Sequence, residues 1–297
     1  MSAQTLAVET AATGDAAAGE RLRVTSHDST PLHGRWFAPQ GAPWAAVLMA
    51  AAIGVEASFY APFAQWLAGQ GAAVLAFDYR GVGESRANAS PRGMRADLDL
   101  WAQDEDAALG VLAARCPGVP LLVLGHSLGA QLAGSLPSRD RLRGLLAVSM
   151  GSGYVGHLVP GFRRQARLFL HLMAPAATAL CGYFPGARLG LVGDLPRGVM
   201  QQWRRWCLSP EYLLSAEGRH ALYRSAAFPV ISLYARDDEM LAEEGARMMF
   251  AAHGNGRRFE VLEPVDGQRI GHLGMFKERH RATHWPRLLH HLRSLGP

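Results

Sequence analysis

Short apolar runs alternate with longer segments of helical spacing along most of this chain. The runs at 43–51, 72–79, 119–125, 142–151 and 229–235 are nearly continuous, which is typical of strands buried on both faces of a parallel sheet. A further strand is expected at 257–265. Apolar residues recur at helical spacing in the segments at 58–71, 94–116, 128–137, 241–254 and 283–296. The alternation predicts an α/β protein with a mostly parallel sheet covered by helices.

Two regions depart from this alternation. Residues 21–28 and 31–39 alternate polar with apolar side chains around Ser29 and Thr30, which predicts a hairpin of two half-exposed strands. From 153 to 226 the strand signal stops, and helical pieces are broken by Pro160, Pro175, Pro185 and Pro196. We interpret this segment as a helical cap inserted above the sheet.

The pattern therefore predicts a core formed by 21–152 and 227–297, with the cap insertion at 153–226. The apolar stretch at 166–184 is as long as a membrane span, but Arg167, His171 and Pro175 interrupt it. We expect a lid helix there and no stable membrane insertion. Residues 1–20 lack the basic and apolar regions of a signal peptide, so a flexible leader is expected.

Composition excludes several classes of function. The 297 residues carry a net charge of +5 and a pI of about 9.4, but the arginines are scattered, which argues against a nucleic-acid partner. The three cysteines show no metal-ligand spacing, so we expect no metal and a reducing, cytoplasmic compartment.

Gly81 and Gly83 follow a strand, but no third glycine completes a dinucleotide fingerprint, and we expect no cofactor. We expect Asp78 and Arg80 to pair and brace that loop. Nothing in the sequence indicates an oligomeric state.

The stretch Gly-His-Ser-Leu-Gly at 125–129 is the main chemical signal. Ser127 stands directly after a predicted buried strand and before a predicted helix, with Gly125 and Gly129 two residues away on either side. A serine on a sharp strand-to-helix turn needs such small neighbours, because the backbone there is crowded and strained. The context favours a nucleophile over a simple glycine turn.

With this motif, and with RIGHLGMF at 269–276 and LYARDDEML at 233–241, the chain resembles the α/β-hydrolase superfamily. The resemblance extends from residue 21 to 297, in the order serine, acid, histidine, and looks nearest to the serine-aminopeptidase-like and monoacylglycerol-lipase-like branch. It implies that His272, in the loop after the last strand, is the base. It also implies backbone oxyanion donors at Leu128 and, in the loop after the third strand, at Ile53. Relatives have a His-Gly pair where this chain has Ala51 and Ala52.

The acid of the resemblance falls on Asp238. Ala235 stands three residues before it and Ala242 four after it, where the family has a glycine and a proline. Asp237 remains the alternative. Only one of two adjacent side chains at a strand end is expected to meet His272, and the other should be a solvated neighbour.

The other histidines are given structural roles. His126 adjoins Ser127 but is expected to point away from it. The pair His280 and His284, and likewise His290 and His291, are interpreted as solvated residues of a basic helix, since no third metal ligand is evident.

These residues predict a serine hydrolase that cleaves a small-molecule carboxylic ester of a small or medium apolar acyl group through an acyl-enzyme. Two alternatives stay open. The same triad could transfer the acyl group to an alcohol or amine, or the fold could serve as a ligand-binding protein without turnover.

Overall fold

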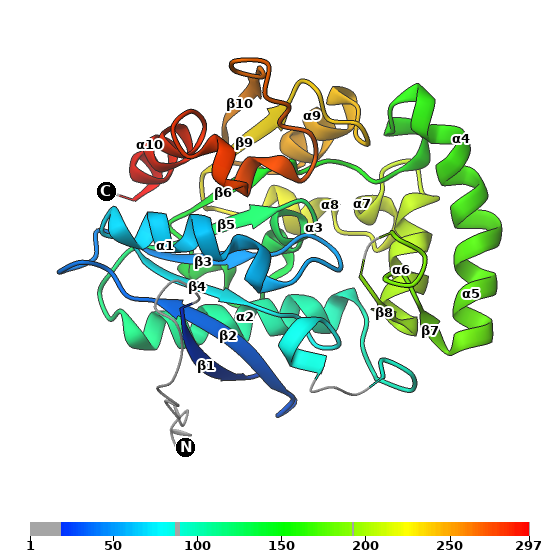
Figure 1. Ribbon diagram of the computed structural model, residues 1–297, viewed down its shortest axis with the longest axis horizontal. Helices are drawn as coiled ribbons and strands as arrows, with labels where there is room; N and C mark the ends of the chain where they lie inside the picture. The colour runs from blue at the N-terminus through cyan, green and yellow to red at the C-terminus, as the bar shows by residue number, and fades with distance from the viewer. Residues whose placement is uncertain (1–18, 87–89, 192, 297) are drawn as a thin grey trace.

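The centre of the molecule is an eight-stranded sheet that confirms the predicted α/β architecture (Figure 1). The computed structural model describes residues 19–86, 90–191 and 193–296, so all but the last two residues of the expected leader lie outside it. The strands of this sheet are β1 (Glu20–Thr25), β2 (Pro31–Phe37), β3 (Ala46–Ala50), β4 (Ala73–Phe77), β5 (Leu121–His126), β6 (Gly144–Val148), β9 (Val230–Ala235) and β10 (Gly256–Leu262).

The strand order is β1-β2-β4-β3-β5-β6-β9-β10. β2 runs antiparallel to both neighbours, and every other pair is parallel. All residues of β3, β4, β5, β6 and β9 are buried, as continuous apolar runs require, whereas β1 and β2 alternate in exposure.

Helices cover both faces of the sheet. On one face α1 (Ala61–Gly69) meets α10 (Trp285–Leu295), where the Phe63 and Trp285 rings lie 5.2 Å apart. On the other, α2 (Leu98–Arg115) packs beside α3 (Leu128–Leu132), and α9 (Glu243–Ala252) packs against β9 and β10. α1 has no side-chain cap at its start, and Tyr60 occupies its N-cap position. A 3-10 turn, Ala57–Tyr60, precedes the helix, which begins at Ala61 with Pro62 in its first turn.

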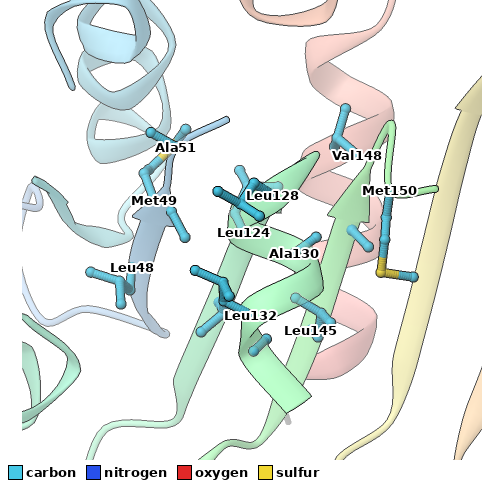
Figure 2. Close-up of a cluster of buried hydrophobic side chains, with 14 of the residues drawn as sticks. Leu48, Met49, Ala51, Leu124, Leu128, Ala130, Leu132, Leu145, Val148 and Met150 are labelled. Atoms are coloured by element: carbon cyan, nitrogen blue, oxygen red, sulfur yellow. The ribbon is translucent and has the colours of Figure 1, made fainter. Parts of the chain in front are cut away.

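Buried apolar side chains surround the turn between β5 and α3. Figure 2 shows Leu124 of β5 and Leu128 of α3 among apolar side chains from β3 and β6, including Met49 and Val148. Leu124, Leu128 and Val148 are at most 1% exposed. This packing fixes the start of α3 relative to three strands, which is the condition for a precisely placed turn residue.

Between β6 and β9 the chain forms the inserted segment, residues 153–226. Its regular elements are α4 (Pro160–Leu168), a π-helical turn (Phe169–Met173), α5 (Ala174–Cys181), β7 (Tyr183–Phe184), β8 (Leu195–Pro196), α6 (Arg197–Cys207), α7 (Leu213–Ala216) and α8 (His220–Arg224). Pro175 has no N–H to donate one turn back, and the π-helical turn ends two residues before it.

In Figure 1, α6 lies between α5 and the rest of the molecule, and it contacts both α5 and α2. The stretch interpreted as a lid is helical over Ala166–Cys181. Among the described residues, no helix has both the length and the apolar character needed to span a bilayer.

Candidate active site

Ser127 occupies a strained turn between β5 and α3. Its φ of 50° and ψ of −110° lie outside the conformations that L-residues ordinarily adopt. The flanking glycines permit the turn. A Cβ on Gly125 would lie 2.4 Å from Ala130 Cα, and one on Gly129 would lie 2.4 Å from the Ala50 carbonyl oxygen. The turn therefore needs both glycines, as the sequence motif predicts.

The structure brings Ser127, His272 and Asp238 together. His272 Nε2 lies 3.1 Å from Ser127 Oγ, and His272 Nδ1 lies 2.8 Å from Asp238 Oδ2. All three side chains are buried, with exposures of 8% for the serine and 5% for each of the other two. Because the carboxylate accepts the Nδ1 proton, Nε2 of neutral His272 is free to accept the serine proton.

The loop after β9 holds Asp238 in its ionised form. Its Oδ1 accepts hydrogen bonds from the N–H groups of Met240 and Leu241, each at 2.9 Å. Burial raises the pKa of Asp238, but the electrostatic attraction and hydrogen bond of the His272 ring, together with these two N–H donors, outweigh burial and hold the pKa below its usual value.

The carboxylates on either side of Asp238 bind the backbone of the loop that carries His272. Asp237 accepts from the N–H groups of Ile270 and Gly271, each at 3.0 Å, and Glu239 Oε2 accepts from His272 N–H at 3.1 Å. The expectation that the second aspartate would be a solvated neighbour is therefore wrong. Its spacing in sequence gave no signal of these contacts, because the partners are more than 30 residues away.

The loop after β3 lies against the serine turn. Gly129 N–H donates to the Ala51 carbonyl at 3.1 Å, and Ala52 N–H donates to Tyr60 Oη at 3.0 Å. Within the described chain, the N–H groups of Ile53 and Leu128 donate to no acceptor. These are the two donors that the family resemblance implies for the oxyanion hole, and both remain available for a ligand.

Asp78 and Arg80 do not pair with each other, which corrects the sequence expectation. Arg80 binds Asp104 and Asp28. Asp78 instead accepts from the N–H groups of Ala57, at 2.7 Å, and Glu84, at 2.9 Å. Through Ala57 it anchors the far end of the loop that contains Ile53.

Three of the four C-terminal histidines that were expected to be solvated, His280, His284, His290 and His291, are buried. His280 is 0% exposed, and its Nδ1 lies 3.2 Å from Nδ1 of His284, which is 3% exposed. His291 is also buried and faces Glu260, while His290 is exposed. Sequence spacing missed their burial because it arises from packing of the C-terminal segment on the rest of the core. No group of three or more potential metal ligands occurs in the described part of the chain.

Comparison with known proteins agrees with the fold. A family model described as serine aminopeptidase, S33, matches residues 41–180. Human monoglyceride lipase is 28% identical over 110 residues, which are 37% of this chain and 35% of the relative. An uncharacterized protein, YfhR of Salmonella typhimurium strain LT2, is 35% identical over 120 residues, or 38% of each chain. The matches thus span little more than a third of either curated relative.

Solved structures resemble the chain over nearly its whole length. A soluble variant of the Saccharomyces cerevisiae monoglyceride lipase superimposes with a TM-score of 0.69 at 16% identity, covering 100% of this chain and 98% of that one. An esterase from Thermogutta terrifontis gives a TM-score of 0.59 at 18% identity, covering 94% and 100%. The molecule has the α/β-hydrolase fold. The sequence matches support the branch that includes the serine aminopeptidases and monoglyceride lipases.

Proposed function

We propose that this protein is a serine hydrolase that cleaves carboxylic esters of small or medium apolar acyl groups. The observation that carries the proposal is the position of His272, within hydrogen-bond distance of both Ser127 and Asp238 at the strained turn. A hydroxyl attacks a carbonyl only when a base takes its proton, and this geometry supplies the base and its orienting carboxylate.

The reaction follows from these roles. Ser127 Oγ attacks the ester carbonyl carbon while His272 Nε2 takes the hydroxyl proton. The Ile53 and Leu128 N–H groups stabilise the resulting oxyanion, each contributing about 3 kcal/mol. His272 then gives its proton to the departing alcohol, leaving an acyl group on Ser127. Water attacks the acyl-enzyme with His272 again as base, which releases the carboxylic acid and restores the serine.

We further propose that the inserted segment acts as a cap over this site. Gly193 packs against Gly54 of the oxyanion loop so closely that a Cβ on Gly193 would lie 2.5 Å from the Gly54 carbonyl oxygen. On the other side, Trp203 Nε1 donates to Tyr212 Oη, which donates to Gln131 of α3, both at 3.1 Å. The segment thus contacts both the oxyanion loop and the helix that follows Ser127.

Acidic residues of the inserted segment give no support to aminopeptidase activity. Clamping a substrate ammonium needs an uncommitted carboxylate. Asp194 pairs with Arg86, Glu211 with His220 and Glu217 with Arg205. An ester is therefore the favoured substrate class.

Ser127→Ala tests the proposal. It should abolish hydrolysis of p-nitrophenyl esters and labelling by a fluorophosphonate probe while the melting temperature stays close to that of the wild type. Ser149→Ala is the matched control, because Ser149 has the same φ of 50° at the end of the adjacent strand. It should retain both activities. Labelling of Ser127→Ala would contradict the nucleophile.

The same assay separates the alternatives. Added acceptor alcohols divert product from acid to ester only if the enzyme transfers acyl groups. A ligand-binding protein would be stabilised by ester without any burst of p-nitrophenol.

A further inference from the structure

A chain of buried hydrogen bonds connects the oxyanion loop to the loop of His272. Ala52 N–H donates to Tyr60 Oη at 3.0 Å, and Tyr60 Oη lies 2.8 Å from His126 Nδ1. On the other side of the ring, His126 Nε2 lies 2.9 Å from the carbonyl oxygen of His272. Ala52, Tyr60 and His126 are 3%, 1% and 0% exposed, so water does not compete for these bonds.

The direction of every bond in the chain is determined. Burial first, and then the neighbouring His272, lower the pKa of His126 to about 3, so its ring is neutral and carries one N–H. A carbonyl oxygen can only accept, which places that proton on Nε2. Nδ1 therefore accepts, the Tyr60 hydroxyl donates to it, and the Tyr60 oxygen is left to accept from Ala52.

Each end of this hydrogen-bond chain fixes a group that the proposed reaction needs. At one end, the Ala52 N–H is occupied by Tyr60 while the next N–H, that of Ile53, has no acceptor in the described chain. At the other end, His126 holds the carbonyl of His272, the residue whose ring faces Ser127. His126, which lies between these two ends, is also the residue directly before Ser127 in the sequence.

We propose that His126 and Tyr60 are positioning residues that set the separation between the oxyanion donor at Ile53 and the base His272. The inference rests on the proposed hydrolase function. It assigns a role to His126. From the sequence, this residue was expected only to point away from the nucleophile. Neither side chain touches the reacting atoms, so their loss should slow turnover and leave substrate binding largely intact.

Tyr60→Phe tests one end of the chain. It removes only the hydroxyl and should lower kcat about ten-fold or more, with KM changed less than about three-fold. Tyr79→Phe is the matched control, because Tyr79 is also 1% exposed and, among the residues that the structure describes, its hydroxyl donates to Glu105 alone, away from the triad. A loss of melting temperature in both variants with no loss of kcat in Tyr60→Phe would overturn the proposal.

Variants of His126 test the other end. His126→Gln retains an N–H donor for the His272 carbonyl, whereas His126→Leu retains none, so the Gln variant should keep more of kcat than the Leu variant. Adding Tyr60→Phe to His126→Leu should cost little further activity, because the chain is already broken. Equal kcat of the His126→Gln and His126→Leu variants, or additive losses of kcat in the double variant, would contradict a connected hydrogen-bond chain.

Nuclear magnetic resonance separates failure of this inference from failure of the proposed function. If the wild type neither labels nor turns over, the hydrolase proposal fails. The hydrogen-bond chain is then still supported if two results are found. Tyr60→Phe should shift the backbone amide signals of both Ile53 and His272, and the His126 ring should be the neutral Nε2–H form at neutral pH. Shifts confined to Ile53, or a protonated His126 ring, would overturn the inference.

Discussion

Asp237 and Gly271 are joined by a hydrogen bond of 3.0 Å between a carboxylate oxygen and a backbone N–H, across 34 residues of sequence. Because Asp237 also accepts from Ile270 N–H, its carboxylate fixes the two residues that lead into His272. The adjacent Asp238 binds the His272 ring itself. Two neighbouring aspartates thus hold the same histidine in different ways, one through the backbone of the two residues before it and one through its ring.

This difference predicts unequal effects of removing each charge. Asp238→Asn should lower kcat about ten-thousand-fold, because the amide favours the wrong tautomer of His272. Asp237→Asn keeps one acceptor oxygen for two N–H donors and should lower kcat only about ten-fold, by displacing the loop. The measurement is kcat on one p-nitrophenyl ester, with the melting temperature as a check on folding. A larger loss in Asp237→Asn would mean that Asp237 is the triad acid.

The position of Ser127 could be predicted because its signal is local: a serine flanked by glycines between a strand and a helix. His272 was expected as the base only from the family resemblance, which implies a histidine in the loop after the last strand. Local patterns also predict the strands: apolar runs, together with polar–apolar alternation in the N-terminal hairpin, indicate every strand of the main sheet. The two-residue strands β7 and β8 left no such signal.

The contacts of Asp237, Glu239 and His126 could not be predicted in this way. Each depends on two loops meeting at one end of the sheet, and local spacing says nothing about which backbone groups then face each other. The expectation that His280 and His284 are solvated was wrong for the same reason, because the sequence of a histidine pair four residues apart is the same whether the pair faces solvent or the core.

The aromatic side chains of the inserted segment predict a preference for longer acyl groups. The rings of Phe169 and Phe184 lie 5.5 Å apart, and Trp203 links this cluster to α3 through Tyr212. We propose that this cluster lines the acyl site, where an apolar wall stabilises a hexanoyl group more than an acetyl group. We expect kcat/KM for p-nitrophenyl hexanoate to exceed that for the acetate, and Trp203→Ala to reduce the ratio.

Leu180→Ala provides the control for this preference, because Leu180 is 81% exposed on the inserted segment. The ratio of hexanoate to acetate rates should be unchanged in that variant. A wild-type rate that falls steadily from acetate to hexanoate to octanoate would argue against an apolar acyl pocket.

Glu105 predicts a pH dependence of stability. Burial raises the pKa of Glu105 to about 8, partly opposed by the hydrogen bond from Tyr79 and reinforced by Asp106. Between its ordinary value of 4.5 and about 8, the folded protein therefore holds a proton that the unfolded chain releases. The free energy of unfolding falls as pH rises through this window.

Glu105→Gln removes this proton linkage while keeping a neutral acceptor for Tyr79. Its melting temperature relative to the wild type should rise from acidic to alkaline pH, by about 5 °C or more at the alkaline end. Glu278→Gln, at an exposed residue paired with Arg281, should follow the wild-type curve. Parallel curves for Glu105→Gln and the wild type would show that Glu105 is ionised in the folded protein.

The contact of Gly193 with Gly54 predicts that one methyl group can separate the inserted segment from the oxyanion loop. A Cβ on Gly193 would lie 2.5 Å from the Gly54 carbonyl oxygen, a backbone atom that cannot rotate away. Gly193→Ala should therefore displace the loop containing Ile53 and lower kcat about a hundred-fold, since donors misplaced by about 1 Å lose most of their effect. Gly161→Ala is the control, because a Cβ there meets nothing within 4 Å. Because glycine destabilises a helix relative to alanine, Gly161→Ala should also raise the free energy of unfolding, by up to about 1 kcal/mol. If Gly193→Ala retains wild-type kcat on short and long esters alike, the inserted segment does not set the position of the oxyanion loop.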